Sequence, residues 1–297
     1  MPWRQCPERR RLIGARLTAI CPEGAEGRDW RPSAPSAYTP AVERLALFDI
    51  DCTLIDGHGA GGRAILRAVK DVYGVEGELG DYSFHGRTDP GIVRDLAALW
   101  GAGDPEAIVG RYEGETQPQV VRDLAERLGT PGDVIDALVD QCVARYVELI
   151  ADEVGKVRIE VLPGVRELVT KLAADPRVLL GLLTGNVLEG ARVKLMPTGL
   201  YPLFEVAAYG SDSALRAELP AVAVARAEKL TGRRFAGKEI VVLGDTPADI
   251  ECGAGLGVKT IAVATGRHRL DELAAHRPDY LFADMSDWRA VHEAILA

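Results

Sequence analysis

The 297-residue chain lacks several features that would assign it directly to a class of protein. It has no uninterrupted apolar stretch of the roughly 18 residues that a membrane-spanning helix needs. Basic residues are in the minority, with 35 Lys and Arg against 44 Asp and Glu, which gives a net charge of −9. A general nucleic-acid-binding protein would instead show a basic surface. We therefore expect neither a membrane span nor a nucleic-acid partner.

Cysteine is also scarce. The five cysteines are dispersed and include no Cys-x-x-Cys pair and no Cys/His cluster at the spacing of a zinc site. An odd number of dispersed cysteines in a chain of this length is typical of reduced thiols. The sequence therefore predicts a cytoplasmic protein without structural zinc.

The first 42 residues lack a sustained apolar period. Residues 1–40 contain seven Arg, no Lys, four acidic residues and six of the 17 Pro, so they carry +3 and the remaining 257 residues carry −12. This composition predicts a poorly ordered N-terminal extension over residues 1–42. A transit peptide fits the arginines but not the four acids, and a secretory signal would need an apolar core. A misassigned start codon is a further alternative.

From residue 44 onward, the chain alternates short apolar runs with helical patterns. Unbroken apolar runs are typical of strands that are buried on both faces of a parallel sheet. They occupy residues 44–50, 178–183, 239–243, 259–264 and 280–282. Helical patterns lie between them, at 164–174, 188–196, 220–231 and 247–255. This order predicts an α/β fold with a doubly wound parallel sheet, which binds ligands at the carboxyl ends of its strands.

One long interval breaks this alternation. Its patterns are helical throughout, at about 63–73, 89–100, 105–128 and 131–151. We interpret residues 58–158 as an inserted α-helical cap domain, and residues 43–57 and 159–297 as the catalytic core. The glycine-rich segment 57–62 and Gly155 are the expected hinges, because glycine tolerates large backbone changes.

Two carboxylates follow the first apolar run. Asp49 and Asp51, with the Thr53 hydroxyl close behind, could divide the work of phosphoryl transfer. One carboxylate would attack phosphorus, while the other protonates the leaving oxygen and later activates water. A divalent cation would neutralise the carboxylates and the phosphoryl oxygens together. A solvated turn with helix-capping aspartates is the alternative.

Two more candidate segments follow the apolar run at 178–183. Thr184, Gly185 and Asn186 follow it and could hold a phosphoryl oxygen at the start of the next helix. A simple helix N-cap explains them equally well. Lys194 lies on that helix, where a lone lysine is usually a surface charge.

The last segment follows the run at 239–243. Asp245 and Asp249 flank Pro247, which marks a helix start. Both carboxylates could approach one cation from a single direction. An N-cap Asp with an acidic first turn is the alternative, since it favours the helix dipole.

Taken in order, these four segments resemble the motifs of the haloacid dehalogenase superfamily of hydrolases. The resemblance covers about residues 43–295, and the insertion is placed as in members with a C1 cap, such as phosphoglycolate phosphatases. The resemblance implies catalytic roles for four residues: Asp49 as nucleophile, Asp51 as general acid/base, and Thr184 and Lys194 as clamps on phosphate and nucleophile. It implies Mg²⁺ held by Asp49, Asp245 and the backbone carbonyl of Asp51, with Asp249 in support. Substrate binding is assigned to Thr53, Gly185, Asn186 and Arg87.

Four further observations on single residues bear on this prediction. Cys52 stands where the family most often has Gly, so we expect slower or oxidation-sensitive activity at worst. Asp51 favours phosphate esters and Mg²⁺, because dehalogenases proper lack an acid there and phosphonate-cleaving relatives carry Ala. Arg87, in the cap segment 84–90, could pair with a substrate carboxylate or distal phosphate. Arg216 follows another strand end near the active-site rim, but a surface arginine is the favoured interpretation.

The sequence therefore predicts a Mg²⁺-dependent phosphatase for small phosphorylated metabolites, such as phosphoglycolate-like compounds or sugar phosphates, acting as a monomer or homodimer. A β-phosphoglucomutase-like phosphotransferase is the nearest alternative, because it shares the nucleophile, the acid/base and the cap. An NAD-binding oxidoreductase is a distant one. Residues 57–62 match G-x-G-x-x-G, but helices rather than a second strand follow. A catalytically inactive regulatory protein is disfavoured, because every motif position retains a reactive side chain.

Overall fold

The computed structural model describes residues 42–73, 79, 82–101 and 132–297. The predicted N-terminal extension, apart from Val42, and the predicted helix at 105–128 lie outside these residues. None of the described helices is both long and apolar enough to cross a membrane.

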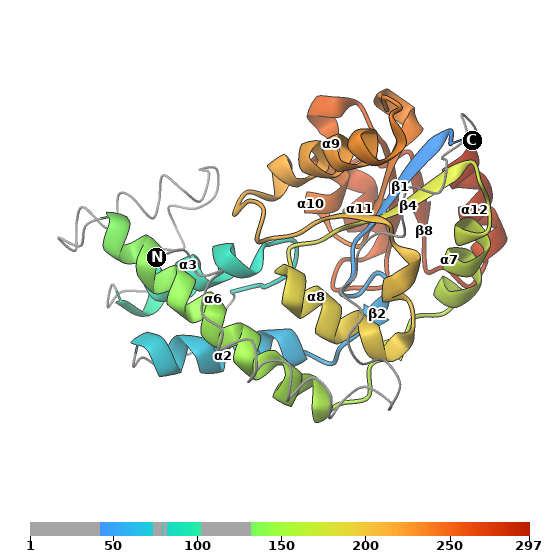
Figure 1. Ribbon diagram of the computed structural model, residues 1–297. Helices are drawn as coiled ribbons and strands as arrows, with labels where there is room; N and C mark the ends of the chain where they lie inside the picture. The colour runs from blue at the N-terminus through green and yellow to red at the C-terminus, as the bar shows by residue number, and fades with distance from the viewer. Residues whose placement is uncertain (1–41, 74–78, 80–81, 102–131) are drawn as a thin grey trace.

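A six-stranded parallel sheet forms the centre of the larger unit (Figure 1). Its spatial order is β5-β4-β1-β6-β7-β8. The strands are β1 (Arg44–Phe48), β4 (Val178–Leu183), β5 (Val206–Ala208), β6 (Ile240–Gly244), β7 (Lys259–Val263) and β8 (Tyr280–Phe282). Every residue of β4, β6 and β7 is buried. The unbroken apolar runs are therefore explained by a sheet that is covered on both faces.

Successive residues of β1 face opposite sides of this sheet. Ala46 and Phe48 pack in the cluster that contains helices α7 (Val165–Ala173), α8 (Leu188–Leu195) and α12 (Trp288–Leu296). Leu45 and Leu47 belong to the cluster on the other face, which α9 (Leu219–Thr231) covers. Helices α10 (Pro247–Glu251) and α11 (Leu270–Ala275) complete the unit. The predicted doubly wound α/β fold is confirmed.

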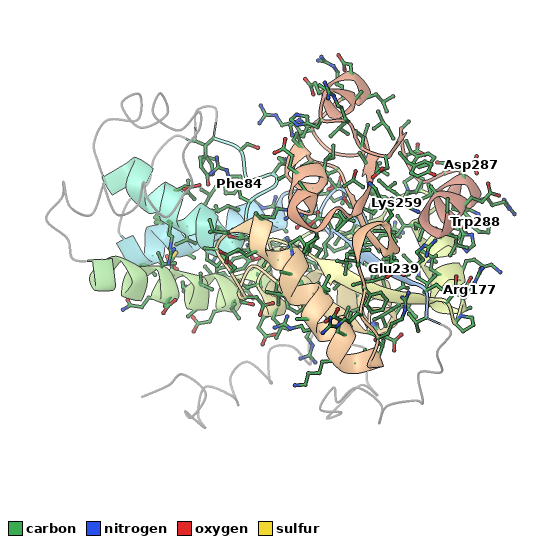
Figure 2. The ribbon with its side chains drawn as sticks, turned by 90° about the horizontal axis from the view of Figure 1, so that it is seen from above. Phe84, Arg177, Glu239, Lys259, Asp287 and Trp288 are labelled. Atoms are coloured by element: carbon green, nitrogen blue, oxygen red, sulfur yellow. The ribbon has the colours of Figure 1, made fainter. Side chains whose placement is uncertain are left out.

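The smaller unit consists of helices from the predicted insertion and lies to one side of the sheet (Figures 1 and 2). Its described helices are α2 (Ala60–Tyr73), α3 (Asp89–Gly101) and α6 (Gly132–Gly155). They share a separate apolar cluster, to which Ile65, Leu96 and Ile150 contribute. The short antiparallel strands β2 (Ile55–Asp56) and β3 (Glu160–Val161) pair where the chain leaves the core and returns to it.

The register of the sheet brings the predicted site segments to one edge. Phe48, the last residue of β1, is paired with Leu182 of β4 and Leu243 of β6. The carboxyl ends of the three central strands are thus aligned, and each is followed by polar residues. Open α/β sheets bind their ligands at this edge.

Candidate active site

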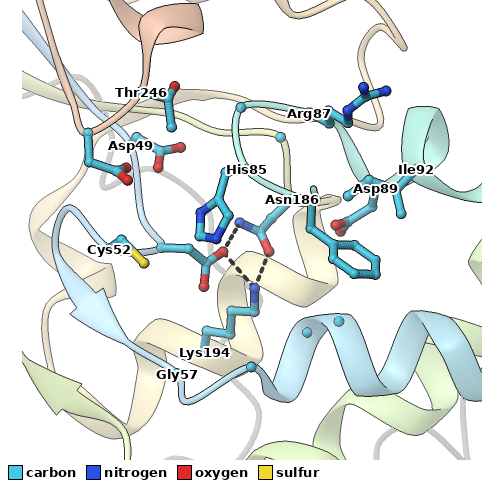
Figure 3. A pocket seen from close by; sticks show the side chains of 18 of the residues that line it. Asp49, Cys52, Gly57, His85, Arg87, Asp89, Ile92, Asn186, Lys194 and Thr246 are labelled. Atoms are coloured by element: carbon cyan, nitrogen blue, oxygen red, sulfur yellow. Dashed lines mark hydrogen bonds and ion pairs between the residues drawn. The ribbon is translucent and has the colours of Figure 1, made fainter. Parts of the chain in front are cut away.

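A cavity of about 210 Å³ lies between the carboxyl ends of the central strands and the helical unit. The core contributes acidic, basic and amide side chains to its walls: Asp49, Asp51, Asn186, Lys194, Arg216 and Asp245. The inserted unit contributes the segment from Phe84 to Arg87, together with Asp89 and Ile92. Residues from distant parts of the sequence therefore line one cavity (Figure 3).

Asp49 is placed by the end of β1. Its backbone N–H donates to the Leu243 carbonyl at 3.0 Å, which continues the pairing with β6. Its carboxylate Oδ1 accepts a hydrogen bond from the Arg216 guanidinium at 3.0 Å. Burial raises the pKa of Asp49 to about 7 although Arg216 opposes the shift, and the Asp249 and Asp51 carboxylates reinforce it.

Arg216 was placed near the active-site rim from the sequence, but the favoured interpretation as a surface arginine was wrong. Its side chain is only 9% exposed, and it pairs with both Asp49 and Asp249. It starts the short 3₁₀ helix that leads into α9. A position just after a strand end was the available signal, but nothing in the local sequence distinguishes this arginine from an exposed one.

Asp51 is held by two partners from the segment after β4. Lys194 Nζ lies 2.7 Å from Asp51 Oδ2, and Asn186 Nδ2 donates to the same oxygen at 2.8 Å (Figure 3). Lys194 also donates to Asn186 Oδ1 at 2.6 Å, so the three side chains form a closed triangle. Partial burial alone would raise the pKa of Asp51, but Lys194 and Asn186 outweigh it and hold the pKa below its ordinary value.

Lys194 is therefore a site residue and not a surface charge, since its side chain is 5% exposed. The resemblance implied that it clamps the nucleophile, whereas its ion pair is with Asp51. Gly61, at the start of α2, makes room for it: a Cβ there would lie 2.8 Å from Lys194 Nζ. Part of the glycine-rich segment thus has a packing explanation. The next strand, β3, is antiparallel to β2, so this segment is not part of a βαβ dinucleotide-binding unit.

Thr184 and Thr53 lie behind the cavity wall, and both are fully buried. Thr184 Oγ1 accepts hydrogen bonds from the backbone N–H and the side-chain amide of Asn186, at 3.2 and 2.8 Å. Thr53 Oγ1 donates to Asp245 Oδ1 at 3.1 Å. Both hydroxyls were predicted to contact phosphate or substrate, but here they orient other site side chains. Gly185 does line the cavity.

Three carboxylates form an acidic cluster beside the cavity. Oxygen atoms of Asp49, Asp245 and Asp249 all lie within 4.8 Å of one another. Asp249, in the first turn of α10, accepts hydrogen bonds from Thr246, and Asp245 follows β6. Burial raises the pKa of Asp245 well above its ordinary value, and the Asp249 and Asp49 carboxylates add to this. Asp245 Oδ2 is buried and has no hydrogen-bond partner among the described residues.

Cys52 has a left-handed backbone conformation, with φ of 59°. This region favours glycine, which accounts for glycine being the commoner residue there. Burial raises the pKa of the Cys52 thiol to about 12, and the Asp245 and Asp51 carboxylates act in the same direction. Because the thiolate is the species that oxidises readily, these surroundings argue against the predicted sensitivity to oxidants.

The segment before α3 closes the cavity from the inserted unit. His85 is exposed and points into the cavity, whereas the Arg87 side chain points away from it (Figure 3). Arg87 forms an ion pair with Asp95 and lies over the Tyr82 ring, 5.0 Å from its centroid. A contact between Arg87 and substrate stays a prediction, and it would have to compete with Asp95. His85 was not singled out by the sequence analysis.

Comparison with protein families agrees with this architecture. A model of haloacid dehalogenase-like hydrolases matches residues 43–257. The pyrophosphatase PpaX of Bacillus pumilus is 31% identical over 121 residues, which are 41% of this chain and 55% of that protein. This chain therefore matches only about half of that relative's length.

Solved structures resemble the chain over most of its length. A predicted phosphoglycolate phosphatase from Haemophilus somnus aligns with a TM-score of 0.52 and 19% identity, covering 84% of this chain and 98% of that one. CbbY from Rhodobacter sphaeroides, solved in complex with phosphate, aligns with a TM-score of 0.51 and 19% identity, covering 83% and 96%. At these identities the likeness shows the fold alone.

Proposed function

Because this chain belongs to the haloacid dehalogenase-like hydrolases, we propose that it is a Mg²⁺-dependent phosphatase that acts on small phosphate monoesters through an aspartyl-phosphate on Asp49. One observation carries the proposal. Asp49 and Asp51 line the same cavity but have different partners. Asp49 lies beside Arg216 and the other two carboxylates of the acidic cluster. Asp51 is bound by Lys194 and Asn186. Two carboxylates in different environments can take different chemical roles.

The acidic cluster fits a divalent cation. Its three carboxylates provide the oxygen ligands that Mg²⁺ prefers, and the unpartnered, buried Oδ2 of Asp245 is otherwise costly. Asp49, Asp245 and the backbone carbonyl of Asp51 would hold the ion, with Asp249 in support. When bound, Mg²⁺ would neutralise the carboxylates and the phosphoryl oxygens together.

In the first step, an Asp49 oxygen attacks phosphorus, and the bond from phosphorus to the ester oxygen breaks. Asp51 gives its proton to the leaving oxygen, which departs as an alcohol. A phosphate dianion beside Asp51 favours the protonated form through like-charge repulsion. Lys194 stays paired with the resulting carboxylate and stabilises it.

In the second step, the Asp51 carboxylate takes a proton from water, and the water oxygen attacks phosphorus. The bond from phosphorus to Asp49 breaks, which releases inorganic phosphate and regenerates both aspartates. Lys194 and Asn186 lower the pKa of Asp51, so its carboxylate is unprotonated when the water arrives. Arg216 accepts no proton and stabilises the Asp49 carboxylate that leaves.

The test is a screen for phosphate release over phosphoglycolate, sugar phosphates and pyrophosphate, with and without Mg²⁺. We expect Mg²⁺-dependent release by the wild type and none by Asp49→Asn. Asp271→Asn is the matched control, because Asp271 is 71% exposed and does not line the cavity. Turnover without metal, or activity that survives in Asp49→Asn, contradicts the mechanism. Isomerised sugar phosphate without phosphate release would identify the mutase instead.

A further inference from the structure

Three side chains with different ligand atoms meet at the junction of the core and the inserted unit. The Cys52 sulfur, a ring nitrogen of His85 and a carboxylate oxygen of Asp245 all lie within 4.8 Å of one another. Cys52 and Asp245 belong to the core, whereas His85 enters from the segment that precedes α3 (Figure 3). The proposed phosphatase mechanism uses neither the thiol nor the imidazole.

A second observation indicates that this cluster lacks a ligand. Asp245 is 1% exposed, and its Oδ2 is buried without a hydrogen-bond partner among the described residues. The Gly266 backbone packs closely against this oxygen without giving it a hydrogen bond, and a Cβ at that position would lie only 1.9 Å from it. A cation bound beside this carboxylate would supply the missing partner.

The donor set selects the cation. Mg²⁺ takes oxygen ligands almost exclusively, whereas sulfur, imidazole nitrogen and carboxylate oxygen together favour Zn²⁺. The geometry points to a Zn²⁺ site formed by Cys52, His85 and Asp245, with the Cys52 proton released to water on binding. Tetrahedral zinc needs ligand atoms about 3.4–3.8 Å apart. A pair of ligand atoms at the 4.8 Å limit would therefore have to approach by about 1 Å. His85 is exposed, which allows it to make this movement.

Such a site has two consequences for the enzyme. Zn²⁺ takes Asp245, which the proposed Mg²⁺ site also requires, so the two cations compete. It also ties the segment around His85 to the core. Zn²⁺ is therefore an inhibitor that acts at the catalytic centre, and glycine at position 52 would remove a ligand.

Binding is tested without any substrate, by titrating the metal-stripped full chain with Co²⁺. A thiolate bound to Co²⁺ gives charge-transfer absorption in the near ultraviolet, and Zn²⁺ should displace it. We expect this absorption in the wild type and its loss in Cys52→Gly, a substitution that the backbone conformation at this position favours. His85→Gln should weaken Co²⁺ binding by about 10-fold or more.

The matched control is Cys142→Ser, because Cys142 is buried in α6 within the inserted unit, away from the cavity walls. It should keep both the absorption and the affinity. Co²⁺ binding without sulfur absorption, absorption that persists in Cys52→Gly, or unchanged affinity in His85→Gln would overturn the site. Inhibition of Mg²⁺-supported phosphate release by Zn²⁺ is the second measurement, and it should weaken in Cys52→Gly. Only this second measurement rests on the proposed function. Failure of the Zn²⁺ site can therefore be distinguished from failure of the proposed phosphatase activity.

Discussion

Arg216 places a positive charge inside a cluster of three buried carboxylates. Its guanidinium pairs with Asp49 and Asp249, and its own side chain is only 9% exposed. Without it, like-charge repulsion would raise the pKa of Asp49 further, and the proposed nucleophile would be protonated at neutral pH. The arginine thus serves the proposed chemistry by opposing the rise in the pKa of Asp49 and increasing its ionised share.

Replacing Arg216 with Ala should therefore lower kcat by about 100-fold, the usual effect of removing one preorganised charge donor. The pH profile of kcat/KM should shift upward, because a higher pH is then needed to ionise Asp49. Steady-state phosphate release from pH 5.5 to 9 measures both effects. Arg216→Lys should recover part of the rate. Arg226→Ala is the control, since Arg226 lies on α9 in an exposed pair with Asp212. A reduced rate with an unmoved pH profile would argue for a purely structural role.

The site residues that could be predicted from the sequence are those that directly follow a buried strand. Asp49, Asp51 and Asp245 follow apolar strands, and the edge at which parallel strands end is known in advance. Arg216 is separated from the end of β5 by an irregular segment, and His85 does not directly follow a strand end. Their place in the cavity depends on how an irregular segment folds back over the strand ends, which apolar periodicity does not report. The Thr53 and Thr184 hydroxyls were predicted to be near the site, but their partners could be learned only from the packed structure.

Thr88 and Asp89, at the start of α3, dock on the core through hydrogen bonds to its backbone groups. Asp89 N–H donates to the Gly185 carbonyl at 2.7 Å, and the Asp89 carboxylate accepts from Val187 N–H at 2.9 Å. Thr88 Oγ1 donates to the Ala214 carbonyl at 2.9 Å. Gly185 permits this approach, because a Cβ there would lie 1.9 Å from the Arg87 carbonyl oxygen.

Gly185→Ala should push this segment away from the core by about 1 Å or more. Misplacement of that size can lower the rate by about 100-fold, and KM should rise because the cavity wall that faces the substrate has moved. Steady-state kinetics with the best substrate from the screen measures both constants. Gly255→Ala is the control, since a Cβ at Gly255 meets nothing within 4 Å. Wild-type kinetics in Gly185→Ala would show that this docking is dispensable.

Helices α2 and α6 are joined by charge as well as by apolar packing. The Glu153 carboxylate, only 3% exposed, pairs with Lys156, Arg63 and Arg67. Hydrogen bonds from Lys156, together with those from the two arginines, overcome burial and lower the pKa of Glu153 to about 2. The three cations are themselves 43–58% exposed, so solvent screens part of this interaction.

Glu153→Gln should lower the free energy of unfolding at pH 7 by about 1–2 kcal/mol. A depressed pKa stabilises the fold above the unfolded value near 4.5, and this contribution is lost as pH falls from there toward 2. Urea unfolding should therefore show a smaller difference between variant and wild type at pH 4 than at pH 7. Glu148→Gln is the control, because Glu148 is 43% exposed and pairs with Arg145 on the same helix. An equal difference at both pH values would contradict an electrostatic origin.

Elements were predictable in proportion to their length and periodicity. The apolar runs that became β4 and β6 were placed to within one residue, and α7, α8 and α9 also matched their patterns closely. The paired strands β2 and β3 have two residues each, and β5 has three, so no period could reveal them. The α10 helix ends at Glu251, four residues before its pattern does, because Gly253 and Gly255 follow.

The net negative charge of the whole chain includes a buried cluster of carboxylates that affects the stability of the fold. Outside the first 40 residues the net charge is −12, and three of those carboxylates are buried within 4.8 Å of one another. Clustering them destabilises the metal-free protein, because burial raises the pKa of Asp245 and ionisation at neutral pH opposes folding. Metal binding to the native state alone would offset that loss.

Asp245→Asn should therefore make the metal-free protein more stable than the wild type at pH 7. A gain of about 1 kcal/mol would raise Tm by about 2–4 °C. The Asn side chain can still accept the Thr53 hydrogen bond, so the change removes mainly charge. Mg²⁺ should stabilise the wild type by about 2.7 kcal/mol at a concentration of 100 times Kd, and so raise its Tm. The Tm of Asp245→Asn should not change with Mg²⁺. Thermal unfolding with and without Mg²⁺ measures both effects, and Asp271→Asn, exposed on α11, should behave as the wild type. If Asp245→Asn is instead less stable without metal, or still gains from Mg²⁺, the carboxylate cluster is not the metal site.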